Sequence, residues 1–178
     1  MQVRASADGF SPQVHDLVVT SNDARDEFEL VTIDSPADLS GVWTMTVSPS
    51  SICRVGFPDS ARGRAYEVLF TQHVTRIQVR ISGPTLDVLN DPNEGAIVGT
   101  RLRFVFVGDT EYGTWSYPDI FDRLSDGGRF GFDGAVEGTV TGSAIRATVN
   151  GDLVYWNAQT WVPTWYCRAK DQVVTMRR

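Results

Sequence analysis

The chain lacks several features that would decide its class. It has two histidines, His15 and His73, and two cysteines, and these four residues do not show the spacing of metal ligands, which argues against a metal centre. No apolar run approaches the roughly 20 residues that a membrane-spanning helix needs, so we expect no membrane insertion. The net charge is -6, and the basic residues, all arginine except Lys170, are scattered, which argues against a nucleic-acid partner.

Residues 1–30 also lack the uninterrupted apolar segment of a secretory signal, because acidic side chains recur through them. We therefore expect a cytoplasmic protein. Cytosolic thiols normally stay reduced, so this location would favour free thiols at the two cysteines.

Cys53 and Cys167 occupy positions that become neighbours if the predicted sheet closes on itself. Cys53 follows the first regular strand pattern, and Cys167 comes before the last. A disulfide between them would close a long loop and stabilise the fold by about 4 to 5 kcal/mol in the chain-entropy treatment. The expected reducing compartment favours free thiols instead, so both states remain open.

The chain does have an alternation of apolar and polar residues that begins at residue 40 and continues to the C-terminus. In residues 40–47 the alternation places Trp43, Met45 and Val47 on one face, as in a half-buried strand. Residues 76–81 repeat the pattern, and no convincing amphipathic helix interrupts it. About eight short strands of this kind predict an all-β fold, a single antiparallel up-and-down barrel over residues 40–178.

Two glycine-containing turns are expected to join neighbouring strands. Gly99-Thr100 separates two short strand patterns and predicts a hairpin. Asn150-Gly151 stands between residues 145–149 and 153–156 and is the strongest hairpin signal in the chain, because both turn residues accept a positive φ.

Residues 108–128 are less regular and hold a dense aromatic set. Aromatic packing under a long loop is one interpretation, and a gate or wall of a ligand site is the other. The aromatic residues are Tyr112, Trp115, Tyr117 and Phe121.

The barrel interior is expected to be apolar and aromatic, with Tyr66 and Gln72 as its polar contacts. Such a lumen either fills with side chains or holds one small ligand. The predicted inward residues are Trp43, Met45, Tyr66, Val68, Phe70, Ile77, Val79, Ile81, Leu102, Phe104, Phe106, Phe130, Phe132, Ile145, Val174 and Met176.

Residues 1–39 precede the barrel pattern and carry short apolar clusters between acidic and small residues. They form either a loose tail or edge strand, or an arm that docks over the mouth of a cavity as a lid. The apolar side chains of such an arm are Phe10, Leu17, Val19, Phe28 and Leu30.

The Gly41-Val42-Trp43 sequence of the first strand, together with an arginine at the end of the last, resembles the lipocalin and wider calycin pattern. The resemblance covers residues 40–178 and implies that the terminal arginine packs across Trp43 at the closed end of the barrel. Alternation along the last strand assigns that role to Arg178 before Arg177. The chain departs from the pattern in having no secretion signal and no obvious helix after the strands.

These departures, the arm and the arginine-rich composition make the chain similar in plan to the lipocalin-like [4+2] cyclases of bacterial spirotetronate and spirotetramate pathways. The resemblance rests on plan and size and implies a cofactor-free enzyme, a monomer or homodimer, whose only partner is a small hydrophobic polyketide-like ligand. A linear polyene tetronate or tetramate would then cyclise inside the lumen.

For that reaction, Gln72 and Tyr66 are the candidate catalytic residues, because either could donate a hydrogen bond to a conjugated carbonyl. The expected substrate contacts are Met45, Val68, Phe70 and Val79. Two alternatives stay open. The barrel could bind a small hydrophobic ligand without turnover, or bulky aromatic side chains could fill it and leave a structural module.

Overall fold

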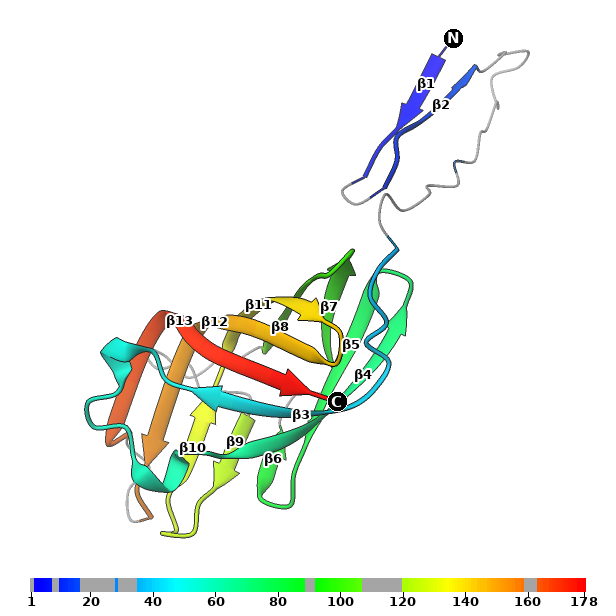
Figure 1. The fold of residues 1–178 in the computed structure, drawn as a ribbon. Helices are drawn as coiled ribbons and strands as arrows, with labels where there is room; N and C mark the ends of the chain where they lie inside the picture. Colours follow the sequence, from blue (N-terminus) through cyan, green and yellow to red (C-terminus); the bar gives the residue numbers. More distant parts are fainter. Residues whose placement is uncertain are drawn as a thin grey trace.

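The computed structural model describes residues 2–7, 10–16, 28, 35–88, 92–106, 120–158 and 163–178. The described residues are almost entirely β-strand, in a small two-stranded sheet and a large eleven-stranded sheet (Figure 1). Within this part of the chain, no helix is both long and apolar enough to cross a membrane.

Eight antiparallel strands of the large sheet close into a barrel, which confirms the predicted all-β barrel. The last strand in the order pairs again with the first, so this part of the sheet has no free edge. The order is β11 (Gly134–Thr141), β8 (Arg101–Phe106), β7 (Asn93–Val98), β5 (Arg76–Ser82), β4 (Ala65–His73), β3 (Gly41–Ser48), β13 (Trp165–Arg177) and β12 (Ala144–Trp156).

A second wall, made of β10 (Arg129–Phe132), β9 (Ile120–Arg123) and β6 (Leu86–Val88), extends the sheet from the far half of β12. The 13-residue β12 pairs with β11 along its first half and with β10 along its second. Figure 1 shows β6, β9 and β10 at the lower side of the molecule and β7, β8 and β11 at the upper side. Because β12 is shared, the wall beside its first half is β11 and the wall beside its second half is β10.

The predicted hairpin at Asn150-Gly151 is wrong, because both residues lie inside β12. Asn150 pairs with Ala135, and the register against β13 shifts between Val149 and Gly151, which marks a bulge. A Cβ on Gly151 would lie 1.9 Å from the backbone oxygen of Asp133. Glycine here permits the close approach of the chain as it passes from β10 to β11.

Of two other sequence predictions, one is confirmed and one is partly corrected. The Gly99-Thr100 hairpin is confirmed, since Val98 pairs with Arg101 across it. The irregular segment 108–128 is partly corrected, because residues 120–123 form β9. Three of its aromatic residues, Tyr112, Trp115 and Tyr117, lie outside the described residues.

Every residue of the predicted inward face is buried, and all of them belong to one core cluster. The side chains come from β3, β4, β5, β8, β10, β12 and β13, so these strands enclose one contiguous apolar core. The period of two along β4, β5 and β8 puts their largest apolar side chains inside and the arginines of β5 and β8 outside.

The Trp43 end of the barrel is closed as the lipocalin resemblance implied. The guanidinium carbon of Arg178 lies 4.7 Å from the centroid of the Trp43 ring. Arg178 also donates hydrogen bonds to the backbone oxygens of Asp38 (2.8 Å) and Ser40 (3.1 Å), and the Trp43 indole donates to the oxygen of Leu39 (2.8 Å). These contacts confirm the choice of Arg178 over Arg177.

The N-terminal arm forms a separate hairpin of β1 (Gln2–Ala5) and β2 (Gln13–Asp16), and within the described residues neither strand pairs with the large sheet. Figure 1 shows this hairpin away from the barrel, and the chain enters the barrel through residues 35–40 at the Trp43 end. The ring of Phe28 stacks on His15 at 4.4 Å. Leu17, Val19 and Leu30 lie outside the described residues, and the lid role stays a prediction.

The loop between β3 and β4, residues 49–64, is fastened to β13. Cys53 and Cys167 form a disulfide with a Cα–Cα distance of 5.6 Å, which answers the question that the sequence left open. The buried Gln172 accepts a hydrogen bond from the Ser50 amide (2.7 Å) and donates one to the sulfur of Cys53 (3.4 Å). Two short 3-10 helices, η1 (Ser51–Cys53) and η2 (Asp59–Ala61), lie within this loop.

Disulfides are typical of oxidising compartments, whereas the acidic first thirty residues led us to expect the cytoplasm. The cellular location stays a prediction.

Candidate functional site

The barrel interior contains a continuous series of aromatic contacts. Trp43 meets Phe70 at a centroid distance of 6.2 Å, Phe70 meets Phe104 at 6.1 Å, Phe104 meets Phe106 at 5.0 Å, and Phe106 meets Phe132 at 5.6 Å. All four contacts are edge-to-face, the arrangement that the ring quadrupole favours. The interior thus has a rigid aromatic lining that begins at the closed end.

The four predicted substrate contacts lie together on one wall of the barrel. Met45, Val68, Phe70 and Val79 are each at most 1% exposed and come from the adjacent strands β3, β4 and β5. Phe70 is paired directly with Val79. The structure brings these side chains together, and their contact with a ligand stays a prediction.

The two predicted catalytic residues do not form one site. Tyr66 and Gln72 are six positions apart on β4, which separates them by about 20 Å along an extended strand. The amide of Gln72 accepts a hydrogen bond from the Leu39 N–H (2.8 Å) and donates one to the oxygen of Val74 (2.9 Å). Gln72 therefore fastens residues 35–40 and the β4–β5 turn at the closed end.

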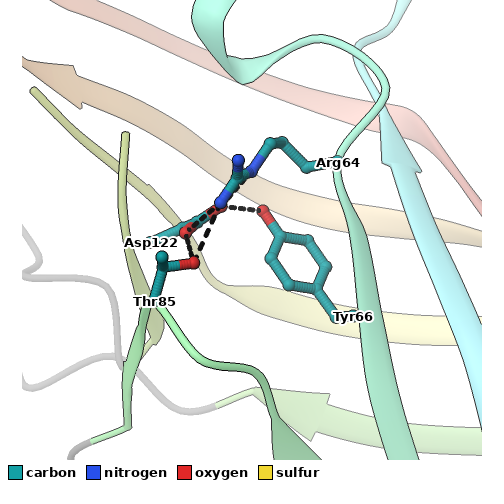
Figure 2. Close-up of polar contacts among 4 residues, drawn as sticks. All are labelled: Arg64, Tyr66, Thr85 and Asp122. Carbon is teal, nitrogen blue, oxygen red and sulfur yellow. Dashed lines mark hydrogen bonds and ion pairs between the residues drawn. The ribbon is translucent and has the colours of Figure 1, made fainter. Parts of the chain in front are cut away.

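Tyr66, at the other end of β4, belongs to a buried polar cluster (Figure 2). Asp122 on β9 is completely buried, and Figure 2 shows its carboxylate among the side chains of Arg64, Tyr66 and Thr85. Its Oδ2 accepts from Nε of Arg64 (2.5 Å) and from the Tyr66 hydroxyl (3.0 Å). Its Oδ1 accepts from Nη2 of Arg64 (2.7 Å) and from the Thr85 hydroxyl (2.6 Å).

These four bonds fill the acceptor sites of the Asp122 carboxylate. Asp122 would have to lose a bond before it could take a proton from a ligand, so the geometry does not favour a general base. Arg64 uses three of its five N–H donors, since Nη2 also donates to Thr85 at 2.9 Å. Within the described residues, Nη1 of Arg64 has no hydrogen-bond partner, and the Arg64 side chain is 30% exposed. Arg64 can therefore still donate to a bound molecule.

The cluster also shifts the pKa values of Tyr66 and Arg64. Burial raises the pKa of the Tyr66 phenol, and the negative charge and hydrogen bond of Asp122 raise it further. The hydrogen bond to Asp122 raises the pKa of Arg64. At neutral pH the site thus presents a neutral phenol and a guanidinium cation in an apolar surrounding.

A pocket of about 270 Å³ opens near this end, between the last residues of β3 and the loop of residues 49–64. Its apolar lining includes Val47, Pro49 and Phe57, and its charged lining is Arg54 and Arg62. Phe57 reaches the core, where its ring meets Phe130 at 5.5 Å. Phe57 therefore belongs both to the pocket lining and to the aromatic packing of the barrel.

Sequence reasoning missed Arg64, Thr85 and Asp122. A signal for Asp122 was present, because Ile120 and Asp122 share a face once residues 120–123 are read as a strand. A buried carboxylate needs a cationic partner, which would have directed attention to the arginines at the strand ends. No three His, Cys, Asp or Glu side chains gather as a possible metal site in the part of the chain that the structure describes.

No protein-family model matches the chain, and no curated protein and no solved structure matches it. The proposal for its function therefore rests on the barrel and its interior.

Proposed function

We propose that the barrel holds one small, mainly apolar molecule and promotes its intramolecular [4+2] cycloaddition without a cofactor. The observation that carries the proposal is the aromatic interior that meets a partly buried Arg64–Asp122–Tyr66 cluster at one end of the barrel, where the Phe132 ring packs on Tyr66. The proposed substrate is a linear polyene attached to a tetronate or tetramate ring, as the resemblance to the bacterial cyclases implies.

The reaction is an isomerisation in which two carbon–carbon σ bonds form as three π bonds become one. It needs neither a nucleophile nor a proton transfer, and positioning of diene and dienophile supplies part of the roughly 7 to 11 kcal/mol available to ideal preorganisation. The rigid walls around Phe70 and Phe132 suit this role, because they leave the polyene few ways to fold.

The polar cluster supports the proposal by offering fixed charge in an apolar site. A hydrogen bond from Nη1 of Arg64 to a carbonyl conjugated with the dienophile would draw electron density from it and lower the barrier. The Tyr66 proton points to Asp122, so Tyr66 would act by keeping Arg64 and Asp122 in place.

The test mixes the protein with an excess of linear polyene tetronate or tetramate and follows mass and diene absorbance. The proposal expects many turnovers to an isobaric product that has lost its diene absorbance. Tyr66→Phe keeps the ring and removes the hydroxyl, and should lower kcat while leaving KM nearly unchanged. Unchanged substrate after long incubation with folded protein would contradict the cyclase proposal.

The second candidate is a non-catalytic binder of a small hydrophobic ligand. The filled acceptor sites of Asp122 favour this binding role, because all four hydrogen bonds of the carboxylate hold neighbouring segments together and none is left for a reacting group. In the same mixture, a binder would leave the substrate unchanged and saturate the change in tryptophan fluorescence at one equivalent.

A further inference from the structure

The pocket beneath the β3–β4 loop combines an apolar floor with a cationic rim. Val47 and Phe57 form the floor and are only 6% and 5% exposed. Arg54 and Arg62 lie at the rim, and both are exposed. Two arginines at one pocket are notable in a chain whose net charge is -6.

The two arginines are not equally neutralised. Arg62 lies 3.1 Å from Asp59, but both side chains are highly exposed, so this ion pair contributes little. Arg62 also makes a long hydrogen bond of 3.4 Å to the oxygen of Phe57. Arg54 has no ion pair with any described residue, which leaves an excess of positive charge at the rim.

The loop that carries these side chains is held in place before any ligand arrives. Arg54 directly follows Cys53, which is bonded to Cys167 on β13. The Trp165 indole donates a hydrogen bond to the oxygen of Val55 at 3.0 Å, and its ring packs against Phe57 at 5.3 Å. A held loop loses little conformational entropy on binding, so the rim is preorganised.

We propose that this pocket binds the carboxylate of a small amphiphilic acid, with Arg54 as its main partner and Arg62 as its second. The guanidinium group matches the two oxygens of a carboxylate, and the apolar part of the acid would lie on Val47 and Phe57. The volume of about 270 Å³ is near the lower limit for ligand pockets, which suits a short acid or one end of a longer ligand.

This inference extends the proposed function by naming the charge of the ligand, and it rests on that function only in placing the ligand at this end of the barrel. The pocket can bind an acid whether or not the barrel catalyses a cycloaddition. The two proposals can therefore fail separately.

The test is calorimetric titration of the full chain with octanoate and with octanamide, a neutral molecule of nearly the same shape. We expect octanoate to bind at one equivalent and at least about tenfold more tightly than octanamide, because a charge-assisted hydrogen bond is worth this much. Arg54→Gln should weaken octanoate about tenfold and leave octanamide unchanged. Arg146→Gln, an exposed arginine on β12 outside the pocket, is the matched control and should change neither affinity.

Equal affinities for octanoate and octanamide, unaffected by Arg54→Gln, would overturn the charge assignment and leave the apolar site of the proposed function standing. If neither compound binds while the polyene substrate still turns over, the pocket is not a ligand site and the cyclase proposal survives. Loss of octanoate binding in the Arg146→Gln control would show attraction to overall charge and would also overturn the proposal.

Discussion

Val74 has a φ of +54° in the two-residue turn between β4 and β5, a conformation that costs a β-branched residue about 1 to 2 kcal/mol. Glycine adopts it freely, although glycine also gains entropy in the unfolded chain. We therefore predict that Val74→Gly raises the free energy of unfolding by about 0.5 to 1 kcal/mol. Urea denaturation measures the change.

Thr75 is the natural control for Val74, because it occupies the other position of the turn and its φ is not positive. Thr75→Gly should lower the free energy of unfolding. If Thr75→Gly raised the free energy of unfolding, or Val74→Gly lowered it, the positive φ of Val74 would not be a source of strain in this turn.

The tyrosines give a prediction about alkaline pH. Burial raises the pKa of Tyr66, and burial together with the Asp152 hydrogen bond raises the pKa of Tyr166 to about 12. A tyrosine whose pKa is raised in the folded state contributes stability that is fully present below its unfolded pKa of about 10 and is lost above it. The free energy of unfolding should therefore fall as pH rises from about 10 to 12.

Absorbance of tyrosinate during a pH titration checks this directly. The chain has five tyrosines, and Tyr66, Tyr155 and Tyr166 all have raised pKa values, so fewer than half should ionise near pH 10 in the folded protein. Simultaneous ionisation of all five near pH 10, with the fold intact, would contradict the burial of Tyr66.

At the scale of elements, β12 depends on its bulge. A Cβ on Gly151 would meet the backbone of Asp133 and Gly134, which cannot move without separating β10 and β11 from β12. We predict that Gly151→Ala lowers the free energy of unfolding by about 3 kcal/mol or more. Chemical denaturation, compared with the wild type, gives the value.

Gly142 is the matched control, because it has a φ of +57° in the β11–β12 turn and an added Cβ would meet no atom within 4 Å. Gly142→Ala should cost only about 1 kcal/mol. Insertion of two glycines extends the comparison, since it should be tolerated after Gly142 and should unfold the barrel after Asn150. A folded protein with the two glycines inserted after Asn150 would contradict the bulge and favour the hairpin that the sequence predicts.

The loop of residues 49–64 provides the next prediction. Cys53 and Cys167 are 114 positions apart, and a bond that closes so long a loop should stabilise the fold by about 4 to 5 kcal/mol. The thermal unfolding midpoint of the Cys53→Ser/Cys167→Ser double variant should be clearly lower than that of the wild type. Addition of reductant should lower the midpoint of the wild-type protein in the same way. Equal midpoints would mean that Gln172 and Trp165 hold the loop without the bond.

At the scale of the whole molecule, the arm and the barrel are separate in their strand pairing. In the part of the chain that the structure describes, β1 and β2 pair with each other and with no barrel strand, so we predict that removal of residues 1–33 leaves the barrel folded with an unchanged thermal midpoint. If the arm closes over a bound molecule, the same deletion should weaken ligand binding or turnover. A lower midpoint without a change in binding would make the arm part of the barrel's core instead.

Much of the fold could be predicted because its signals are local. The period of two gave the inward face, and alternation along β13 identified Arg178 as the partner of Trp43. Asn150-Gly151 misled because the same residues suit a tight turn and a bulge, and only the approach of Asp133 decides between them.

The polar cluster is beyond local reasoning for a different reason. Arg64 and Asp122 are 58 positions apart, and they meet only because β9 folds against the start of β4. Gln72 looked equivalent to Tyr66 in the strand pattern, yet the barrel has a closed end and an opposite end, and the two residues lie at different ends. Alternation along a strand predicts whether a side chain faces inward or outward. It does not predict which distant residue that side chain will contact, because the tertiary fold determines this.

The proposed function requires the barrel to take one apolar molecule into its interior. The most direct measurement is calorimetric titration, at several temperatures, with a saturated analogue of the polyene tetronate that cannot cyclise. We expect one equivalent to bind with a negative heat-capacity change, the signature of apolar surface removed from water. No binding heat at any temperature, or binding with no heat-capacity change, would show that the aromatic side chains fill the barrel and that it holds no ligand.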